Sequence, residues 1–267
     1  MNEDLPFFIK SRLRTRVVGS EVVYYRETDS TNDDAVQFAT RGVEEGWVII
    51  AGNQRSGKGR RGKTWSAPGG QNVYLSLILR PRISTKRASL LTILAALSVA
   101  EVLEEYIQKD RGQVSIKWPN DVMIDDKKIS GILLQMGKDK NNEIFYVIGI
   151  GININARGQD IPEAIQDIAT SLYMELGYAV SLKDVLFKLM YRLDYWYRLY
   201  CGRRFDEIIA RFRSYESTTG KRVSVMAAGR IIEGEAIGID DNGFLHVRDD
   251  AGKVHTSTSG ELTIEDE

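Results

Sequence analysis

The chain has 267 residues, of which 43% are hydrophobic and 27% are charged, and its formal net charge at pH 7 is -1. This composition is that of a globular protein, and the length fits one large domain or one domain with a small appendage, given a prior of roughly 100–200 residues per domain. The nearly balanced charge excludes a general attraction to nucleic acid or to a membrane surface, so a site for polyanions has to come from local clustering of charge.

The first part of the chain alternates predicted strands with helices and one long loop. A β-rich run over 21–27 precedes Ser30, where a Ser–x–x–acid pattern predicts the start of a helix that ends near Gly42. Strands are predicted over 47–51 and 72–79, and residues 52–71 between them are predicted to form a loop. Apolar residues at helical spacing then predict a helix over about 86–108.

The rest of the chain divides into a β-rich stretch, a helical stretch and a second β-rich stretch. Residues 114–155 are expected to be all-β, and helices are expected over 162–214. Within those helices, Tyr191, Tyr195 and Trp196 are expected to pack into a core. After 216–220, short strands broken by glycine predict a small antiparallel barrel or sandwich. We therefore expect two domains, 1–216 and 217–267.

Few side chains are suited to redox or imidazole chemistry. Cys201 is the only cysteine, which is typical of a reducing compartment, and we expect it to be a small buried hydrophobe. With only His246 and His255, a histidine-rich metal site or a Ser-His-Asp triad is poorly supported. The chain opens without the pattern of a signal peptide, and no run approaches the ~18 consecutive apolar residues of a membrane-spanning helix. These features predict a cytoplasmic protein without membrane contact.

The segment from Gln54 to Trp65 gives the strongest indication of chemistry. Five basic residues fall within positions 55–63, with no acid among them, and three glycines alternate with them. Glycine lets backbone amides approach a ligand and form a concave anion nest, and arginine and lysine add charge-assisted hydrogen bonds. The segment is therefore predicted to hold anionic groups, and Trp65 is an aromatic side chain able to cover a flat ring.

Three other interpretations of this segment have to be weighed. Residues 52–58 match the P-loop pattern G-x-x-x-x-G-K after a strand, but Gly59 stands where that motif needs Ser or Thr. A basic segment is also typical of nucleic-acid binding, but no further basic cluster and no helix-turn-helix pattern support it. A plain solvated loop would leave the three glycines and Trp65 unexplained.

Four separated motifs, taken in their order and spacing, resemble the biotin protein ligase family over about residues 22–265. The glycine-arginine segment together with Lys-Trp-Pro-Asn-Asp is highly specific, whereas each other motif alone would be weak. The motifs are Asp29-Ser30-Thr31-Asn32, Gln54-x-x-Gly57-x-Gly59-Arg60-x-Gly62-x-x-Trp65, Lys117-Trp118-Pro119-Asn120-Asp121, and Lys128-Ile129-x-Gly131-Ile132-Leu133 followed by Gly149-Ile150-Gly151-Ile152-Asn153.

The resemblance implies an α/β catalytic domain with a mixed sheet, followed by a small SH3-like β-barrel. It also implies that ATP activates biotin as biotinyl-5'-AMP and that biotin is then attached to a specific lysine of a biotin carboxyl carrier protein. Mg²⁺ is expected to neutralise the departing pyrophosphate. Some family members carry an N-terminal DNA-binding domain. Only about 29 residues precede Ser30, so we expect the ligase-only class without DNA binding. The sequence leaves undecided whether the protein forms a homodimer.

Two alternatives to this function remain. A lipoate-protein ligase shares the superfamily fold, and a non-catalytic biotin or nucleotide sensor would bind the same ligands without turnover. Exchange of pyrophosphate into ATP that depends on biotin separates all three, because it requires formation of the biotinyl-adenylate.

The resemblance assigns biotin to residues of the first three motifs. Short polar side chains at 30–32 and at 54 correspond to the contacts of the ureido ring, and the basic segment corresponds to a loop over the carboxylate and the adenylate phosphate. The family often has arginine where Lys58 stands, and lysine lacks the bidentate fork, so we expect a backbone role there. The predicted biotin-binding residues are Ser30, Thr31, Asn32, Gln54, Lys58, Gly59, Arg60 and Lys117.

The nucleotide is assigned to an overlapping set. Trp65 is expected to stack on adenine, Lys117 and Arg60 are expected to act in catalysis, and Asp121 is a candidate acceptor for the proton of the attacking lysine. As local structure alone, Ser30 to Asn32 would be a helix cap and Lys117 to Pro119 a strand end with a turn. The predicted nucleotide-binding residues are Arg60, Arg61, Trp65, Lys117, Asn120, Lys128 and Asn153.

Overall fold

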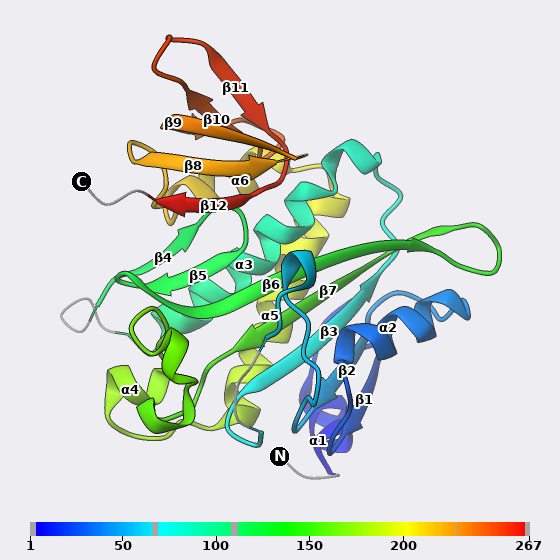
Figure 1. The fold of residues 1–267 in the computed structure, drawn as a ribbon. Coiled ribbons are helices and arrows are strands. Elements are labelled where there is room, and N and C mark those ends of the chain that lie inside the picture. Colours follow the sequence, from blue (N-terminus) through cyan, green and yellow to red (C-terminus); the bar gives the residue numbers. More distant parts are fainter. Residues whose placement is uncertain (1–3, 66–68, 108–111, 228, 265–267) are drawn as a thin grey trace.

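The computed structural model describes residues 4–65, 69–107, 112–227 and 229–264 and arranges their strands in two sheets of unequal size (Figure 1). The larger sheet has seven strands in the order β1-β2-β3-β7-β6-β5-β4, and the smaller has five in the order β11-β10-β9-β8-β12. The strands of the larger sheet are β1 (Glu21–Tyr25), β2 (Trp47–Ala51), β3 (Val73–Leu79), β4 (Val114–Lys117), β5 (Asp121–Ile124), β6 (Lys127–Lys138) and β7 (Ile144–Ile152). Those of the smaller sheet are β8 (Arg222–Ala227), β9 (Arg230–Ile239), β10 (Leu245–Arg248), β11 (Val254–Ser257) and β12 (Glu261–Ile264).

The larger sheet is mixed, as predicted. β1 and β2 are parallel and are joined through helix α2 (Thr31–Thr40), whereas every other neighbouring pair in this sheet is antiparallel. β3 is an interior strand between β2 and β7 and is buried along its whole length, which explains its continuous apolar sequence. The smaller sheet is antiparallel throughout, so the small C-terminal β-domain expected from the sequence is confirmed.

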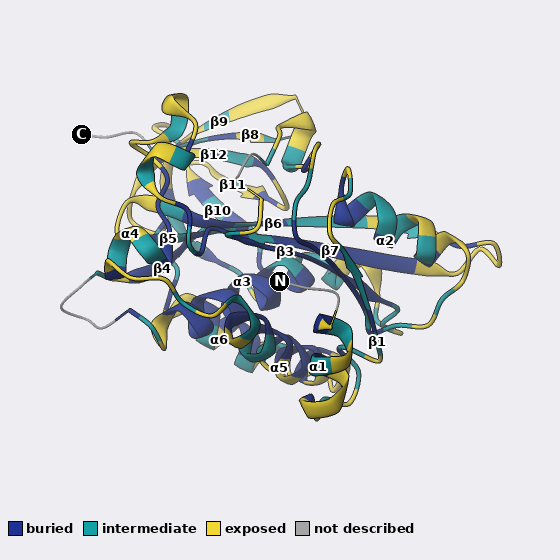
Figure 2. Cartoon of the chain, turned by 90° about the horizontal axis from the view of Figure 1, so that it is seen from below, coloured by how far each residue is buried: buried dark blue, intermediate teal, exposed yellow. Residues whose placement is uncertain are grey.

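The helices cover the two faces of the larger sheet unequally. α3 (Ser89–Glu104), α5 (Leu182–Cys201) and α6 (Phe205–Arg213) lie on one face, and α2 lies on the other with the basic segment (Figure 2). α3 packs between the sheet and the other two helices, so nearly every side of it is buried. It begins later than predicted, because Thr85–Arg87 forms a 3-10 turn, and predicted residue 108 lies outside the described residues.

The helical stretch is more broken than the sequence predicts. Before α5 it contains the 3-10 turns Gly158–Asp160 and Glu163–Ile165 and the short helix α4 (Leu172–Leu176). The expectation of core packing is confirmed for Trp196, which is 5% exposed, but is wrong for Tyr191 and Tyr195, which are each 44% exposed. Burial of Cys201 is also wrong, because it lies exposed at the C-terminal end of α5. Both errors arise because only one side of α5 faces α3.

The N-terminal helix α1 (Leu5–Arg12) is not predicted by the sequence analysis. Leu5 and Ile9 are its fully buried residues, and such a short apolar pattern is a weak signal. The chain after it is held by a distant carboxylate, since Asp194 Oδ1 accepts the backbone N–H groups of Arg16, Val17 and Val18 at 2.8–3.1 Å. The segment is therefore ordered by tertiary contacts.

The junction between the two sheets is tied to the strand that carries Lys117. The Ile116 N–H donates a hydrogen bond to the Tyr215 carbonyl at 2.8 Å, and the Ile116 carbonyl accepts one from the Ser217 N–H at 3.1 Å. Both partners belong to the segment that connects the two sheets. The Trp118 N–H donates to Thr218 Oγ1 at 3.0 Å, and its buried indole N–H donates to the Gly243 carbonyl at 2.9 Å. Lys117 is thus held between neighbours fixed to both sheets.

None of the helices among the described residues combines the length and the apolar character needed to cross a membrane.

Candidate active site

A cavity of about 600 Å³ lies between the larger sheet, the basic segment and the edge of the smaller sheet. Its walls come from segments that are far apart in sequence, including α2, β6, β7 and β12. Every site residue predicted from the sequence lines this one cavity, and the individual roles given to these residues stay predictions. The residues are Ser30, Thr31, Asn32, Gln54, Lys58, Gly59, Arg60, Arg61, Trp65, Lys117, Asn120, Asp121, Lys128 and Asn153.

One corner of the cavity is a network of short polar side chains. Gln54 Oε1 accepts both the Thr31 N–H, at 2.8 Å, and the Thr31 hydroxyl, at 3.0 Å. Asn32 Nδ2 donates to Gln135 Oε1 at 2.9 Å, and the Ser76 hydroxyl contacts Thr31 Oγ1 and Asn32 Oδ1 at 2.8 and 2.6 Å. With its carbonyl oxygen used by Thr31, Gln54 can offer a ligand its two amide N–H donors.

Ser30 does not act as a helix cap through its side chain. It occupies the N-cap position of α2, but its hydroxyl makes no capping hydrogen bond, and only 2% of the residue is exposed. Capping is the usual reason for serine at this position. The local explanation by a cap alone is therefore wrong. The Ser30 hydroxyl lies on the cavity wall and is not used to cap the helix.

Three glycines make the floor of the cavity. Gly131 and Gly151 are cross-strand partners on β6 and β7, and a Cβ atom on Gly151 would lie 2.5 Å from the Trp65 ring. A Cβ atom on Gly149 would lie 2.0 Å from Asn32 Oδ1. Contacts this short are forbidden, so the glycines let Trp65 and Asn32 lie directly on the sheet. The fourth sequence motif contains these glycines, but it does not show that Trp65 and Asn32, which belong to other motifs, are the side chains that pack on them.

The basic segment is a small hairpin rather than an open loop. The Gly59 N–H donates to the Lys63 carbonyl at 2.7 Å, and the Trp65 N–H donates to the Gly57 carbonyl at 2.8 Å. Arg61 and Gly62 form the tip with φ of 53° and 78°. The expected anion nest is therefore wrong for the Gly59 and Trp65 amides, which are used within the hairpin. Gly57 is required because a Cβ atom there would meet the Trp65 carbonyl at 2.6 Å.

Carboxylates on both sides hold the hairpin over the cavity. On the α2 side, Arg55 pairs with Asp29 at 2.7 Å and with Glu27 at 3.1 Å, and Lys58 pairs with Asp33 at 2.6 Å. The Lys58 side chain is thus already paired, and the expectation that a ligand would meet its backbone stays a prediction. All these side chains are substantially exposed, so each pair contributes little by itself.

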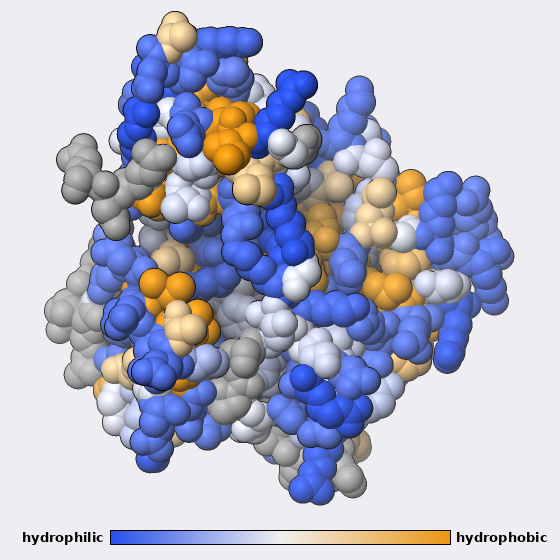
Figure 3. All heavy atoms as spheres, viewed as in Figure 1, coloured by the Kyte–Doolittle hydropathy of each residue, from blue (hydrophilic) through white to orange (hydrophobic). Residues whose placement is uncertain are grey.

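The smaller sheet holds the other side of the hairpin. Lys63 pairs with Glu261 on β12, which lowers the pKa of that carboxyl, and Arg61 Nη2 donates to the Met226 carbonyl at 2.5 Å. Residues 260–263 line the cavity beside them. Figure 3 shows the result as a hydrophilic ridge across the middle of this face, with apolar residues exposed on either side of it.

Arg60 and Lys117 are the cations that face inward. Burial lowers the pKa of both groups, Asp121 opposes that effect in each case, and a neighbouring cation adds to it, Arg61 for Arg60 and Lys128 for Lys117. Arg60 Nη1 donates a hydrogen bond to Asn120 Oδ1, which fixes the direction of the guanidinium. Two partly desolvated positive charges in one cavity are a strong attraction for an anion.

The Asp121 carboxylate is already bonded to two neighbouring side chains. Its Oδ1 accepts the Lys128 ammonium at 2.7 Å and the Asn120 amide at 2.8 Å. To take a proton from another group, the carboxylate would have to weaken the ion pair with Lys128. Its predicted role as proton acceptor therefore stays a prediction, and its visible role is to balance the neighbouring cations.

Two buried polar atoms on the cavity wall lack a hydrogen-bond partner among the described residues. They are the donor Trp65 Nε1 and the acceptor Asn153 Oδ1. The Lys128 ammonium lies 5.6 Å from the centre of the Trp65 ring, and Ile165, Ile168 and Ala169 form the adjacent wall. Buried polar atoms are normally paired, so this end of the cavity is suited to a flat ligand with both a donor and an acceptor.

Several contributors to the site are not found by sequence reasoning. Ser76 and Gln135 sit in the middle of apolar strands, where a lone polar side chain with its partner distant in sequence gives only a faint signal. Glu261 and Ile168 give no local signal at all. Among the described residues, no group of three or more His, Cys, Asp or Glu side chains is placed to hold a metal ion.

Comparison with known proteins matches both parts of the chain. Residues 24–155 match the model of the Biotin/lipoate A/B protein ligase family, and residues 218–262 match the Biotin protein ligase C terminal domain. The chain is 35% identical over 246 residues to the Bifunctional ligase/repressor BirA of Bacillus subtilis, covering 91% of this chain and 74% of that protein. It is 28% identical to the Biotin--[acetyl-CoA-carboxylase] ligase of Mycobacterium tuberculosis, covering 94% of this chain and 93% of that protein.

A similar solved structure is the biotin protein ligase from Aquifex aeolicus in complex with biotin and ATP. The two folds agree with a TM-score of 0.79 at 30% sequence identity, over 93% of this chain and 100% of that chain.

The desolvated charge of Lys117 leads to a prediction about stability. Its pKa lies below the ordinary 10.5, so the folded state releases this proton more readily than the unfolded state. The resulting cost is fully present below the folded pKa and disappears as pH rises through 10.5. Lys117→Met should therefore raise the melting temperature at pH 7 without ligands, and the gain should shrink at higher pH. The exposed Lys127→Met is the control, and an equal or lower melting temperature for Lys117→Met would contradict the assignment.

Proposed function

The chain belongs to the biotin protein ligase family, and from this premise we propose that the cavity first joins biotin to AMP and then delivers biotin to a lysine of its carrier. The activity is that of a biotin--[acetyl-CoA-carboxylase] ligase, which attaches biotin to a carrier protein through an adenylate intermediate. The observation that carries the site assignment is the placement of two desolvated cations, Arg60 and Lys117, in the same cavity as the polar corner around Asn32.

Biotin is assigned to the polar corner. Its ureido ring carries N–H donors and a carbonyl acceptor, and the side chains of Ser30, Thr31, Asn32 and Gln54 supply both types of partner. The dithiolane ring of lipoate has neither group, so in a lipoate ligase these buried side chains would face sulfur and carbon without a partner. This comparison favours biotin over lipoate.

The first half-reaction is assigned to Arg60 and Lys117. The biotin carboxylate is ionised at neutral pH and attacks the α-phosphorus of ATP, so no general base is needed. The difficulty is that two anions have to approach each other, and fixed cations in a partly dry cavity reduce that repulsion without reorganising. The hairpin adds charge through Arg61 and shields the adenylate from water.

The nucleotide is assigned to the end of the cavity near Trp65. Adenine offers both a donor and acceptors, which would satisfy Asn153 Oδ1 and Trp65 Nε1, while Lys128 and Asn120 lie on the same wall. Mg²⁺ is proposed to arrive with ATP, since this ion commonly binds substrate phosphates with one or two carboxylates. Asp121, Asp126 and Glu261 are the acids that line the cavity, and Asp121 and Glu261 are already paired with lysines.

The remaining parts of the proposal concern the whole chain. We place the division between the catalytic and C-terminal domains at 216–217, just before Thr218 leads into β8. ATP as a substrate and a single cysteine fit the cytoplasm. No DNA-binding role is proposed, because the net charge of -1 offers no general attraction for nucleic acid.

Biotin-dependent exchange of labelled pyrophosphate into ATP tests the function. Wild-type protein should catalyse the exchange with biotin but not with lipoate, and Lys117→Ala should slow it about 100-fold or more, as loss of one transition-state contact does. Exchange that depends on lipoate and does not occur with biotin would identify a lipoate ligase. Binding of biotin and ATP without any exchange would identify a sensor, and normal exchange in Lys117→Ala would remove that residue from the mechanism.

The role of Arg60 predicts a change in where biotin goes. Without its guanidinium the cavity loses an inward cation and its bond to Asn120, so the adenylate should escape into solution. Arg60→Gly should therefore form the adenylate and label lysines of bystander proteins, measured by blotting with streptavidin in a mixture of unrelated proteins. Arg60→Lys is the matched control, which keeps the charge. Bystander labelling at the wild-type level, with adenylate still formed, would contradict this role.

We also propose a homodimer through the open edge of β6. β5 pairs with β6 only as far as Gly131, so beyond it alternate backbone groups of β6 point to an edge that no described strand covers. Met136 near the end of β6 and Ile144 at the start of β7 are 61% and 40% exposed. Met136→Lys should weaken self-association in sedimentation velocity, whereas Met174→Lys on α4 should not. A wild-type protein that is monomeric at all concentrations would reject the dimer.

A further inference from the structure

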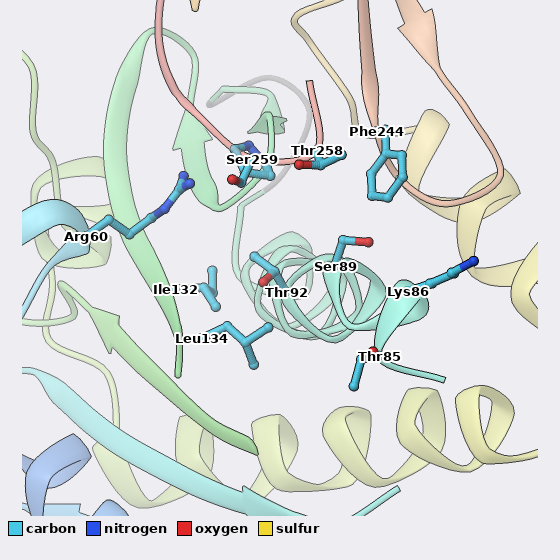
Figure 4. A pocket seen from close by; sticks show the side chains of 12 residues that line it. Arg60, Thr85, Lys86, Ser89, Thr92, Ile132, Leu134, Phe244, Thr258 and Ser259 are labelled. Atoms are coloured by element: carbon cyan, nitrogen blue, oxygen red, sulfur yellow. The ribbon is translucent and has the colours of Figure 1, made fainter. Parts of the chain in front are cut away.

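A second cavity, of about 350 Å³, lies on the other side of Arg60 (Figure 4). Ser89 and Thr92 approach it from α3, Ile132 and Leu134 from β6, and Thr258 and Ser259 from the segment between β11 and β12. This second cavity therefore lies between the two sheets, and its mouth is formed by exposed residues such as Thr258 and Ser259.

Arg60 stands between the two cavities. Arg60 and Ile132 line both of them, and Figure 4 shows the guanidinium reaching toward Ser259 from one side of the second cavity. Asn120 accepts a hydrogen bond from this guanidinium. Arg60 and Ile132 thus lie between a group in the second cavity and the place assigned to the activated carboxyl of biotin.

The walls of the second cavity suit a long alkyl chain that ends in a neutral amine. Pro119, Ile132, Leu134 and Phe244 offer apolar surface to methylene groups, and the hydroxyl groups of the lining can accept from an amine. The charged side chains of the lining are Arg60 and Lys86, and the Lys86 ammonium points away from its centre (Figure 4). With a cation and no carboxylate in its described lining, the cavity disfavours an ammonium and favours the free amine.

We propose that the second cavity admits the acceptor lysine of the carrier protein and delivers it as a free amine past Arg60. This inference rests on the proposed function. The lysine nitrogen attacks the carbonyl carbon of the biotinyl-adenylate, an amide C–N bond forms, and the C–O bond to AMP breaks. The proton released from the nitrogen leaves with the AMP phosphate. Because only a free amine is a nucleophile, the cationic wall selects the reactive form before contact.

The same wall could attract an anion, so pyrophosphate is the competing occupant. The two occupants predict different losses. Blocking an acceptor site should slow transfer of biotin and leave adenylate formation intact, whereas blocking a pyrophosphate site should slow the exchange of pyrophosphate into ATP. Biotin-dependent exchange is therefore measured beside transfer for every variant.

Filling the second cavity provides the first test. Thr92→Phe from α3 and Ser259→Trp from the mouth add bulk at positions that line the second cavity and not the first, and Thr256→Trp on β11, a position that lines neither cavity, serves as the control. Single-turnover transfer from preformed biotinyl-adenylate to the purified biotin carboxyl carrier domain should slow at least tenfold in the two filled variants. Exchange in all three should stay within twofold of the wild type, and transfer to hydroxylamine, a small neutral amine, should change little.

A matched pair at one position tests the charge argument. Thr92→Asp places a carboxylate in the second cavity, and Thr92→Asn places a neutral group of the same shape there. The carboxylate should stabilise the lysine ammonium, so the pH at which transfer reaches half its maximum should be higher for Thr92→Asp than for Thr92→Asn. Arg60 and Lys86 are the charged groups of the lining that act on the same amine.

Each result has a definite meaning. Loss of exchange together with transfer in the filled variants would assign the second cavity to pyrophosphate and overturn the proposal. Unchanged transfer in both filled variants, or identical pH profiles for Thr92→Asp and Thr92→Asn, would mean that the lysine reaches the adenylate elsewhere. Failure of the wild type to exchange pyrophosphate would instead reject the proposed function itself.

Discussion

The site depends on keeping two cations, Arg60 and Lys117, partly out of water and close to one counter-charge, Asp121. Burial lowers the pKa of both, so the fold spends stability to hold them there. Their surroundings limit that cost. Asn120 accepts from Arg60 and donates to Asp121, and Lys128 pairs with Asp121, so the charges form one connected group. Trp118, the residue next to Lys117, donates hydrogen bonds to Thr218 and Gly243, which fixes the backbone position from which the lysine side chain extends.

The smaller sheet is therefore part of the site rather than an appendage. It supplies residues 260–263 of the cavity wall, the Met226 carbonyl and Glu261 carboxylate that hold the tip of the hairpin, and the Gly243 carbonyl that receives Trp118. Each contact joins it to a segment that carries a predicted site residue. Because the hairpin and Trp118 are both bonded to the smaller sheet, that sheet fixes the hairpin and the residue next to Lys117 relative to each other.

The sequence was informative where a signal is local. Strand boundaries such as 47–51 follow from apolar periodicity, whereas the mixed sheet and the set of cavity residues were implied by the family resemblance that the contiguous motifs carry. It was uninformative where the partner is remote. Asp194 organises residues 16–18, Ser76 and Gln135 fix Thr31 and Asn32, and the floor glycines are needed only because Trp65 and Asn32 lie on them. Tyr195 has the same periodicity as a core residue, and only the placement of α5 decides that it is exposed.

The two half-reactions make opposite demands on the same charges. Activation brings together a carboxylate and a polyanion, and in the proposed assignment Arg60 and Lys117 favour that encounter. Release of pyrophosphate then removes most of the negative charge, so the same two cations are left in excess around the adenylate. That excess opposes an incoming ammonium but not a free amine. Cations that assist the first step can thus assist the second by selecting the nucleophilic form of lysine, and this explains how one cavity can serve both steps without a dedicated base while Asp121 stays paired with Lys128.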